Sequence, residues 1–293
     1  DWGSADNDQA LLDCLVKATP QELIAFDFTD GSNWNAEIDG AFLPDYPENL
    51  AKSRPKYPAL IGDMLEESAT AIQGVDDGDL TNVTKQTAFD MMKSVYSYYD
   101  EQTIANMTQT MIDVYSKGVE PGVDDHMGWT KLMTQMFTGL SFDSYMIRDV
   151  QWHRKAGNEN LWLFTLAHRS LLPFNMEIDG WIPIAHCFDL PYLWFYPDIW
   201  ETYNASDSDF AVADYIGEMW ANFAKNGELS LPRVGDTMNY IEIGDFITLK
   251  SNWKSEANTV YNKQLPSYLG EFPPLSISDD SWTKIKNTGA KWV

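Results

Sequence analysis

The chain has 293 residues, 44% of them hydrophobic and 14% aromatic, which excludes a disordered chain and allows one large core or two ordinary ones. The formal net charge of −24 would repel polyanions, so no nucleic acid and no anionic membrane surface is expected as a partner. No apolar run reaches the roughly 18 residues that a membrane span needs, and the opening stretch DWGSADNDQA lacks the regions of a signal peptide.

The first predicted elements are two short helices. Leucines recur at helical spacing within residues 11–15. The segment TPQE then begins a second helix, because Thr19 can cap the first turn, Pro20 suits the first helical position and Glu22 can close a capping box.

The middle of the chain is predicted to be helical from Thr81 to about Lys155. Tyrosine, methionine and phenylalanine recur there at spacings of three and four residues, which is typical of buried helix faces. The methionine-rich pieces FDMMKSV and KLMTQMF are interpreted as helix core and not as a cofactor box. A further amphipathic helix is predicted over residues 207–227, ending at Gly227 in a left-handed cap.

Strand signals are fewer. Residues 57–62 (YPALIG) and 161–168 (LWLFTLAH) are short apolar runs bounded by turn residues, as in strands buried on both faces. Residues 238–249 (MNYIEIGDFITL) alternate like an edge hairpin. Strands separated by long helical stretches predict an α/β protein.

Two acidic residues and one histidine are the candidate site. Glu66 and Glu67 follow the 57–62 strand, and His186 lies in the apolar stretch WIPIAHCFDLPYLWF after the 161–168 strand. Functional residues of open α/β sheets sit just past the carboxyl ends of strands, and an acid followed by a histidine matches the order in α/β-hydrolases. From the residues alone, His186 could be a catalytic base, a metal ligand or a half-buried ring.

The other histidines give weaker signals. His168 ends a predicted strand, and the residues alone do not rank it below His186. His153 lies in a charged helical stretch and is expected to be exposed. Asp124, Asp125 and His126 are neighbours on one loop, which is a poor metal ligand set, so neither a metal nor a cofactor is expected.

Cysteines and glycosylation sequons bear on the compartment. Cys14 and Cys187 are too few for a disulfide scaffold; they could pair with each other, stay reduced or pair with another chain. Three sequons, at Asn82, Asn106 and Asn204, favour a secretory route, with the protein secreted or lumenal.

Several segments in order resemble the C-terminal portion of the type-B carboxylesterase and cholinesterase family. They are ALLDCL with TPQEL, IDGAFLPDYPENL, PALIGDMLEES, AHCFDLPYLWF and MWANFAKNG. They run over nearly all of the chain. The resemblance implies an α/β-hydrolase fold, with residues 1–293 as the C-terminal part of one domain: the later strands of the sheet plus covering helices.

The resemblance also implies a carboxylic-ester hydrolase with a Ser-Glu-His triad and a small-molecule ester as substrate. Counted from Gly62, the acid is Glu67, and the histidine of the family's pattern is His186. Glu66 is then expected to point towards solvent or a helix. Asp189 matches an acidic position that supports the site, although it could equally be a charge at a helix N-terminus.

The sequence departs from the family's pattern in two places. Cys187 stands where the family has glycine after the histidine. The nucleophile elbow Gly-x-Ser-x-Gly is missing, and its nearest match, residues 139–143 (GLSFD), lacks the second glycine. The serine is therefore expected in a missing N-terminal half, and the resemblance implies that Cys14 forms a disulfide with that absent segment.

Three functional readings follow. The first is an ester hydrolase; a general esterase is favoured over a cholinesterase because residues 68–74 (SATAIQG) contain no aromatic residue. The second is a non-catalytic binding or adhesion protein of the same family. The third, a chain that acts alone, is disfavoured because half a sheet would expose an aggregation-prone edge.

Overall fold

A computed structural model describes residues 5–24, 38–73, 80–96, 99–172, 176–194 and 196–270. The chain forms two compact units, one made of residues 1–47 and 279–293 and the other of residues 48–278. The second unit contains the sheet and both acidic residues of the candidate site.

The described part of the first unit holds the two predicted helices, α1 (Ala5–Lys17) and α2 (Pro20–Ile24). The predicted capping box is present: the backbone N–H of Thr19 donates to Glu22 Oε2 at 2.7 Å, and the N–H of Glu22 donates to Thr19 Oγ1 at 3.2 Å. These hydrogen bonds to Thr19 lower the pKa of the Glu22 carboxyl. The helix start read from TPQE is therefore confirmed.

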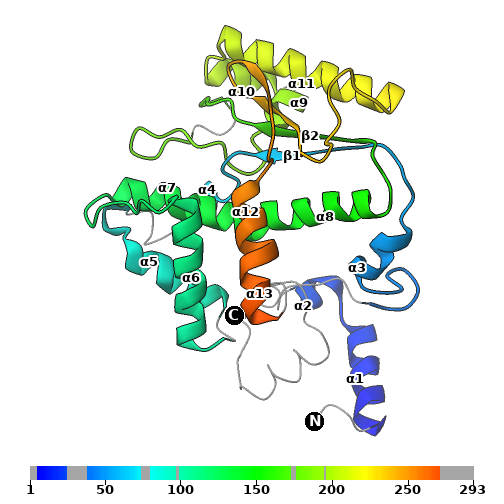
Figure 1. Cartoon of the computed structure of the whole chain (residues 1–293). Coiled ribbons are helices and arrows are strands. Elements are labelled where there is room, and N and C mark those ends of the chain that lie inside the picture. Colours follow the sequence, from blue (N-terminus) through cyan, green and yellow to red (C-terminus); the bar gives the residue numbers. More distant parts are fainter. Residues whose placement is uncertain are drawn as a thin grey trace. The chain divides into compact units, whose positions relative to one another are not determined.

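The sheet has four strands in the order β1-β2-β3-β4 (Figure 1). They are β1 (Ala59–Met64), β2 (Leu161–Leu166), β3 (Tyr240–Ile243) and β4 (Ile247–Lys250). β1, β2 and β3 run parallel, and β4 closes an antiparallel hairpin with β3. The predicted strands and hairpin are confirmed, although β1 ends two residues later than expected and β2 two residues earlier.

The remaining described helical elements have these bounds: α3 (Pro47–Leu50), η1 (Ala51–Ser53), α4 (Ala69–Gln73), η3 (Leu80–Asn82), α5 (Lys85–Val95), α6 (Glu101–Tyr115), α7 (His126–Thr138), the π-helical turn η4 (Gly139–Asp143), α8 (Ser144–Lys155), α9 (Leu190–Trp194), α10 (Pro197–Thr202), α11 (Asp207–Asn226), α12 (Ser255–Thr259), the π-helical turn η5 (Val260–Gln264) and α13 (Leu265–Leu269). The helical prediction for Thr81 to Lys155 is confirmed, with breaks between α5 and α6 and between α6 and α7.

Helices cover the sheet on both faces. α9, α10 and α11 lie on one side of β1 and β2, and α7, α8 and α12 lie on the other (Figure 1). Side chains of β2 alternate between the two cores: Leu161 and Leu163 join the cluster under α6–α8, and Phe164 and Leu166 join the cluster under α9–α11. This double burial explains why β2 is apolar except for Thr165, whose hydroxyl donates to Asp63 at 2.8 Å.

The apolar residues of α11 recur at helical spacing and form part of the core between this helix and the sheet. Ser206 caps its first turn by accepting a hydrogen bond from the N–H of Asp209, and Gly227 ends it at φ 67° in the left-handed region. Val212, Ile216 and Met219 are buried against the sheet, as their spacing predicts.

A buried ion cluster joins β1, η4 and the start of α12. Lys254 Nζ lies 2.6 Å from Asp63 Oδ2 and 3.2 Å from Asp143 Oδ1. Burial by itself lowers the pKa of Lys254, but the charges of Asp143 and Asp63 outweigh it and the net pKa is raised. Removing one member would leave buried charge uncompensated, so the cluster ties these three elements together.

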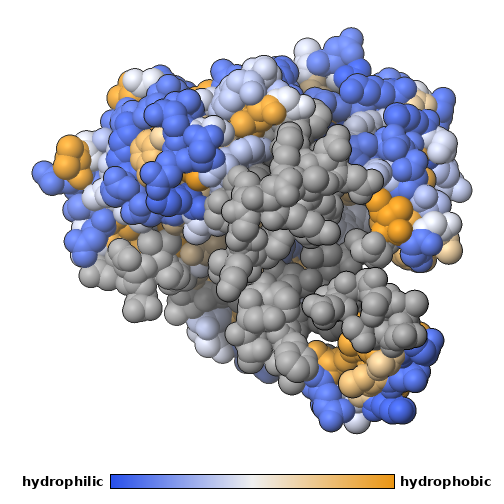
Figure 2. Space-filling model, turned by 90° about the horizontal axis from the view of Figure 1, so that it is seen from below, coloured by the Kyte–Doolittle hydropathy of each residue, from blue (hydrophilic) through white to orange (hydrophobic). Residues whose placement is uncertain are grey.

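The surface is strongly polar, in keeping with the net charge of −24. On the face seen in Figure 2, hydrophilic residues predominate over the described part, and hydrophobic ones form small separate patches. Within the described ranges, none of the helices has the length and apolar character to cross a bilayer.

Two glycines give opposite expectations for stability. A Cβ at Gly62 of β1 would overlap the ring of Phe164, whereas a Cβ at Gly217 of α11 would meet open space. Gly62→Ala should therefore destabilise the protein by about 1–3 kcal/mol through overpacking. Gly217→Ala should stabilise it by about 0.5–1 kcal/mol because alanine is the better helix former. Urea unfolding followed by circular dichroism measures both changes, and shifts of the same sign would contradict the packing described.

Candidate functional site

Glu67 and His186 form a hydrogen-bonded pair beyond the carboxyl end of β1. His186 Nδ1 lies 2.7 Å from Glu67 Oε2, and the backbone N–H of Met64 donates to Glu67 Oε1 at 2.8 Å. The carboxylate is buried, whereas 55% of the His186 side chain is exposed. The expected hydrogen bond between Glu67 and His186 is thus present, and it joins a buried carboxylate to a solvent-accessible imidazole. The catalytic roles of the two residues stay a prediction.

The backbone brings the two residues together. The chain leaves β1 at Met64 and runs beside the segment that carries the histidine: the N–H of Glu66 donates to the carbonyl of Ile184 at 2.9 Å, and the N–H of His186 donates to the carbonyl of Glu67 at 3.1 Å. Cys187 then turns the chain away with φ 68°. Pairing of these two backbones therefore fixes where the ring meets the carboxylate.

The pair is arranged to leave one ring nitrogen available. Burial raises the pKa of Glu67, and the hydrogen bonds from Met64 and His186 partly offset it. Because an ionised carboxylate can only accept, Nδ1 of His186 is the donor and Nε2 keeps its lone pair in the neutral ring. No hydroxyl of the described residues hydrogen-bonds to Nε2; the ring packs against Phe142 of η4, with centroids 5.1 Å apart.

The expectation that Glu66 points towards solvent or a helix is wrong. Glu66 is buried and forms a two-pronged ion pair with Arg169, at 2.7 and 2.9 Å, while its Oε2 also accepts the N–H of Ile184 at 2.8 Å. A partner 103 residues away in the chain stabilises a carboxylate that local sequence assigns to the surface. Sequence reasoning missed Arg169, and its place just after β2 is the signal that could have indicated it.

Asp189 lies half-buried immediately before α9. Burial raises the pKa of its carboxyl, and the charge of His186, together with backbone hydrogen bonds, partly opposes that rise. No hydrogen bond between Asp189 and His186 is formed. Asp189 thus fits both expectations: it interacts electrostatically with His186, and it is an acidic residue directly before α9. Its supporting role in the site therefore stays a prediction.

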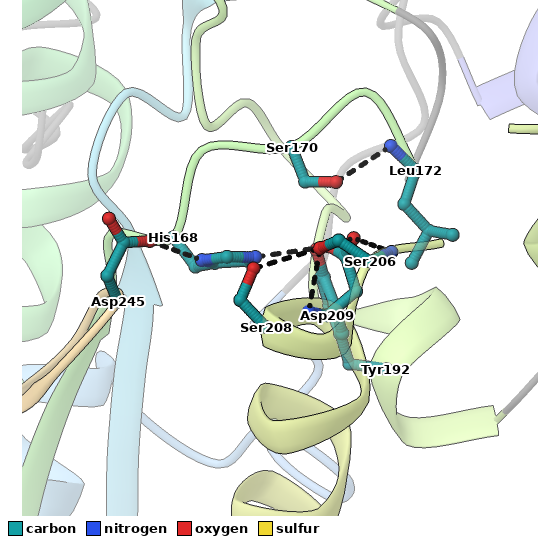
Figure 3. Close-up of polar contacts among 8 residues, drawn as sticks. All are labelled: His168, Ser170, Leu172, Tyr192, Ser206, Ser208, Asp209 and Asp245. Carbon is teal, nitrogen blue, oxygen red and sulfur yellow. Dashed lines mark hydrogen bonds and ion pairs between the residues drawn. The ribbon is translucent and has the colours of Figure 1, made fainter. Parts of the chain in front are cut away.

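His168, which the residues alone could not rank below His186, occupies a separate cluster (Figure 3). Its Nε2 lies 3.1 Å from Asp209 Oδ1 and its Nδ1 lies 3.0 Å from Asp245 Oδ1. The hydroxyl of Tyr192 donates to the same oxygen of Asp209 at 3.0 Å. The buried ring thus joins the end of β2, the β3–β4 turn, α9 and α11, and it does not contact Glu67.

The remaining histidines serve local structure. His126 Nδ1 donates to the carbonyl of Val83 at 2.8 Å, and Asp125 caps α7 by accepting the N–H of Gly128. The expectation that His153 is exposed is wrong: its side chain is 13% exposed and its ring nitrogen contacts Asn158 at 3.2 Å, because α8 packs that face inward. In the parts of the chain that the structure describes, no three acidic, histidine or cysteine side chains group as a metal site.

The cysteines and the asparagines of the three sequons differ in their exposure to solvent. Cys14 is exposed and Cys187 half-buried, and neither forms a disulfide with the other. A bond from Cys14 to an absent segment stays a prediction. Asn82, Asn106 and Asn204 are all exposed, as glycan acceptors must be, and their glycosylation likewise stays a prediction.

A parallel sheet covered on both faces by helices, with an acid after one strand and a histidine after the next, defines an α/β-hydrolase fold. The model of the carboxylesterase family matches residues 2–263. The chain belongs to the carboxylesterase family.

Similar proteins include neuroligins as well as carboxylesterases. Mouse and human neuroligin-3 are each 23% identical over 273 residues, covering 88% of this chain and 31% and 30% of their own lengths. Mouse carboxylesterase 1C is 22% identical over 288 residues, covering 92% of this chain and 49% of its own. A crystal structure of a Geobacillus stearothermophilus carboxylesterase superposes with a TM-score of 0.60 at 16% identity, over 85% of this chain and 50% of that one. The chain thus spans between about a third and a half of the length of these relatives.

The His168 cluster makes stability depend on pH. Burial lowers the pKa of His168, but hydrogen bonds and charges from Asp209 and Asp245 outweigh it, so the folded pKa is raised. A histidine whose pKa is higher in the folded than in the unfolded state stabilises the fold. This contribution is fully present below the unfolded pKa of about 6.5 and is lost as pH rises through the folded-state pKa. Wild-type unfolding free energy should therefore fall from about pH 6 upwards, and His168→Gln should flatten that fall.

Urea unfolding at several pH values measures the slope. His126→Gln is the control, since its ring contacts a backbone carbonyl and no carboxylate; it should keep the wild-type slope. Equal slopes in His168→Gln and wild type would contradict the prediction.

Proposed function

We propose that this chain carries the acid and the base of a serine carboxylesterase, Glu67 and His186, and that the nucleophilic serine lies in a missing N-terminal part of the same protein. The observation that carries the proposal is the 2.7 Å contact between a buried carboxylate and an accessible imidazole. Membership of the carboxylesterase family supports it.

Each group has a defined task in ester hydrolysis. The serine hydroxyl attacks the carbonyl carbon of a small-molecule ester while its proton passes to Nε2 of His186. Glu67 holds Nδ1–H and stabilises the imidazolium. The proton then goes to the leaving alcohol oxygen as the C–O bond breaks, which leaves an acyl-enzyme. Water attacks the acyl-enzyme in the same way, releasing the acid and returning the proton to serine.

The sheet offers a place for the missing part. β1 pairs with β2 along one edge, and none of the described strands pairs with its other edge. An open edge between helical layers favours further strands of the same sheet. We therefore expect the N-terminal half to extend the sheet at β1 and to bring its serine to Nε2 of His186.

The substrate is proposed to be a general small-molecule ester and not a choline ester. Residues 68–74 after Glu67 include no aromatic side chain that could face a quaternary ammonium group. A secreted or lumenal location is proposed from the three exposed sequons, Asn82, Asn106 and Asn204.

The full-length protein tests the two roles. His186→Ala should remove nearly all turnover because the ring is the proposed acceptor of the serine proton. Glu67→Gln should lower kcat by about 10⁴-fold, as loss of the carboxylate does in a serine protease triad. His126→Gln, which loses a histidine elsewhere, should keep wild-type activity. Initial rates with a short-chain nitrophenyl ester measure all three; turnover that survives in His186→Ala would defeat the proposal.

The isolated chain gives a second test. The 293-residue polypeptide, purified from a host without esterases, should show no turnover above background, because it has no serine in a nucleophile elbow. The same nitrophenyl assay applies. Turnover that a serine-directed organophosphate abolishes would show that the nucleophile lies within this chain.

A non-catalytic relative of the neuroligin kind is the second candidate function. The likeness to neuroligin-3 over 88% of this chain favours it. Retention of the Glu67–His186 pair argues for the enzyme. The two functions differ upstream: a Gly-x-Ser-x-Gly elbow in the preceding sequence means an esterase, and an elbow with its serine replaced means a binding protein.

A further inference from the structure

Arg169 is held between two groups beside the candidate site. Its guanidinium forms the two-pronged ion pair with Glu66, and its NH1 group also donates to the backbone carbonyl of Ile182 at 2.6 Å. Arg169 thus contacts one residue on each of the two segments that meet at the acid–base pair: the side chain of Glu66 after β1 and the backbone carbonyl of Ile182 on the way to His186.

Glu66 connects the same two segments from the other side. Its Oε2 accepts the N–H of Ile184 and its own N–H donates to the carbonyl of Ile184, two residues before His186. Arg169 and Glu66 together therefore fix the register of residues 182–186 along residues 65–67. A slip by one residue would move His186 by about 3.3 Å, the rise of an extended chain, and break its contact with Glu67.

The hydrogen bonds of the His168 side chain hold the backbone next to Arg169 in place. The ring of His168 is hydrogen-bonded on both nitrogens, to Asp209 of α11 and to Asp245 in the β3–β4 turn (Figure 3). Asp209 is itself held by Tyr192 and by Ser206. The residue just before Arg169 is therefore tied to α11 and to the β3–β4 turn, which restricts the position from which the Arg169 side chain reaches Glu66.

We propose that Arg169 is a positioning residue for the acid–base pair: through Glu66 and the carbonyl of Ile182 it holds His186 against Glu67. The proposal rests on the proposed function for its meaning in catalysis, but the contact that it explains exists without catalysis.

A positioning role differs from a stabilising one. The Arg169 side chain is 41% exposed, but its partner Glu66 is buried, so loss of Arg169 leaves a buried carboxylate without its cation and lowers stability as well. Displacement of a catalytic group by about 1 Å can cost about 100-fold in rate. The rate and the exchange of the His186 ring proton, both measured on folded protein, therefore report the positioning role separately from stability.

The test uses the full-length protein with three variants. Arg169→Gln removes the positive charge and the two parallel N–H donors that bind Glu66. Arg169→Lys keeps the charge but cannot reach Glu66 and Ile182 with a planar fork. Arg54→Gln is the control, because the Arg54 side chain is about as exposed as that of Arg169, 31% against 41%, and also pairs with a carboxylate, that of Asp149 at 2.6 Å, which unlike Glu66 reaches solvent.

Two readouts are measured. The first is kcat and KM with a nitrophenyl ester: Arg169→Gln should lower kcat about 100-fold, with KM changed by less than about threefold, because a mispositioned base acts on the transition state. Arg169→Lys should recover part of the loss. The second is the NMR signal of the His186 Nδ1–H, assigned by its disappearance in His186→Ala; its exchange with solvent should become about tenfold faster in Arg169→Gln, as when a supporting partner is lost.

The two readouts separate this proposal from the proposed function. A wild-type protein without ester turnover refutes the proposed function, and the Nδ1–H exchange rate still decides the role of Arg169. Faster exchange in Arg169→Gln than in Arg54→Gln supports the proposal in either case. Equal exchange rates in Arg169→Gln and Arg54→Gln overturn it, as does a kcat of Arg169→Gln equal to that of Arg54→Gln in an active enzyme. If Arg169→Gln fails to fold, Arg169→Lys is measured in its place by the same criteria.

Discussion

The parallel pairing of β1 with β2 is the constraint on which the rest of the structure depends. The two strands match residue for residue, from Ala59 opposite Leu161 to Met64 opposite Leu166, and the N–H of Leu65 continues the ladder to the carbonyl of Leu166. Both strands therefore end at the same level. Glu66 leaves one strand where Arg169 leaves the other, so these two opposite charges meet at one edge although 103 residues separate them in sequence.

Local patterns in the sequence predicted the elements that depend on neighbours in the chain. The capping box at Thr19, the strands and the stripe of α11 follow from spacing, and family resemblance singled out Glu67 and His186. What the sequence did not reveal depends on partners distant in the chain. Glu66 resembles a surface glutamate until Arg169 is placed beside it, and no local rule places α8 so that His153 turns inward. The π-helical turn that sets Phe142 against His186 was missed because an extra residue in a helical turn leaves no mark on the hydrophobic period.

Charge in this protein is distributed unevenly between surface and interior. The excess of acidic residues is mostly solvated, whereas the buried carboxylates each have a cationic or hydrogen-bonding partner, as Asp63 has Lys254 and Glu66 has Arg169. Glu67 and Asp209 differ, because each has a histidine among its partners, His186 and His168 respectively. Among the described residues these two pairs differ in access, since 55% of the His186 side chain is exposed and only 2% of that of His168, and this difference supports the proton-transfer role proposed for Glu67 and His186.

Cys187 adopts φ 68° directly after His186, a backbone region that costs a side-chain-bearing residue about 1 kcal/mol or more. Local preference opposes this turn, and what imposes it is hydrogen bonding by its neighbours: His186 to the carbonyl of Glu67, Phe188 to that of Ala185 and Leu190 to that of Cys187. A peptide excised around the histidine would relax to another conformation. The orientation of the imidazole is therefore a property of the assembled core, acquired only when the segment docks, and any local opening of that segment would release it.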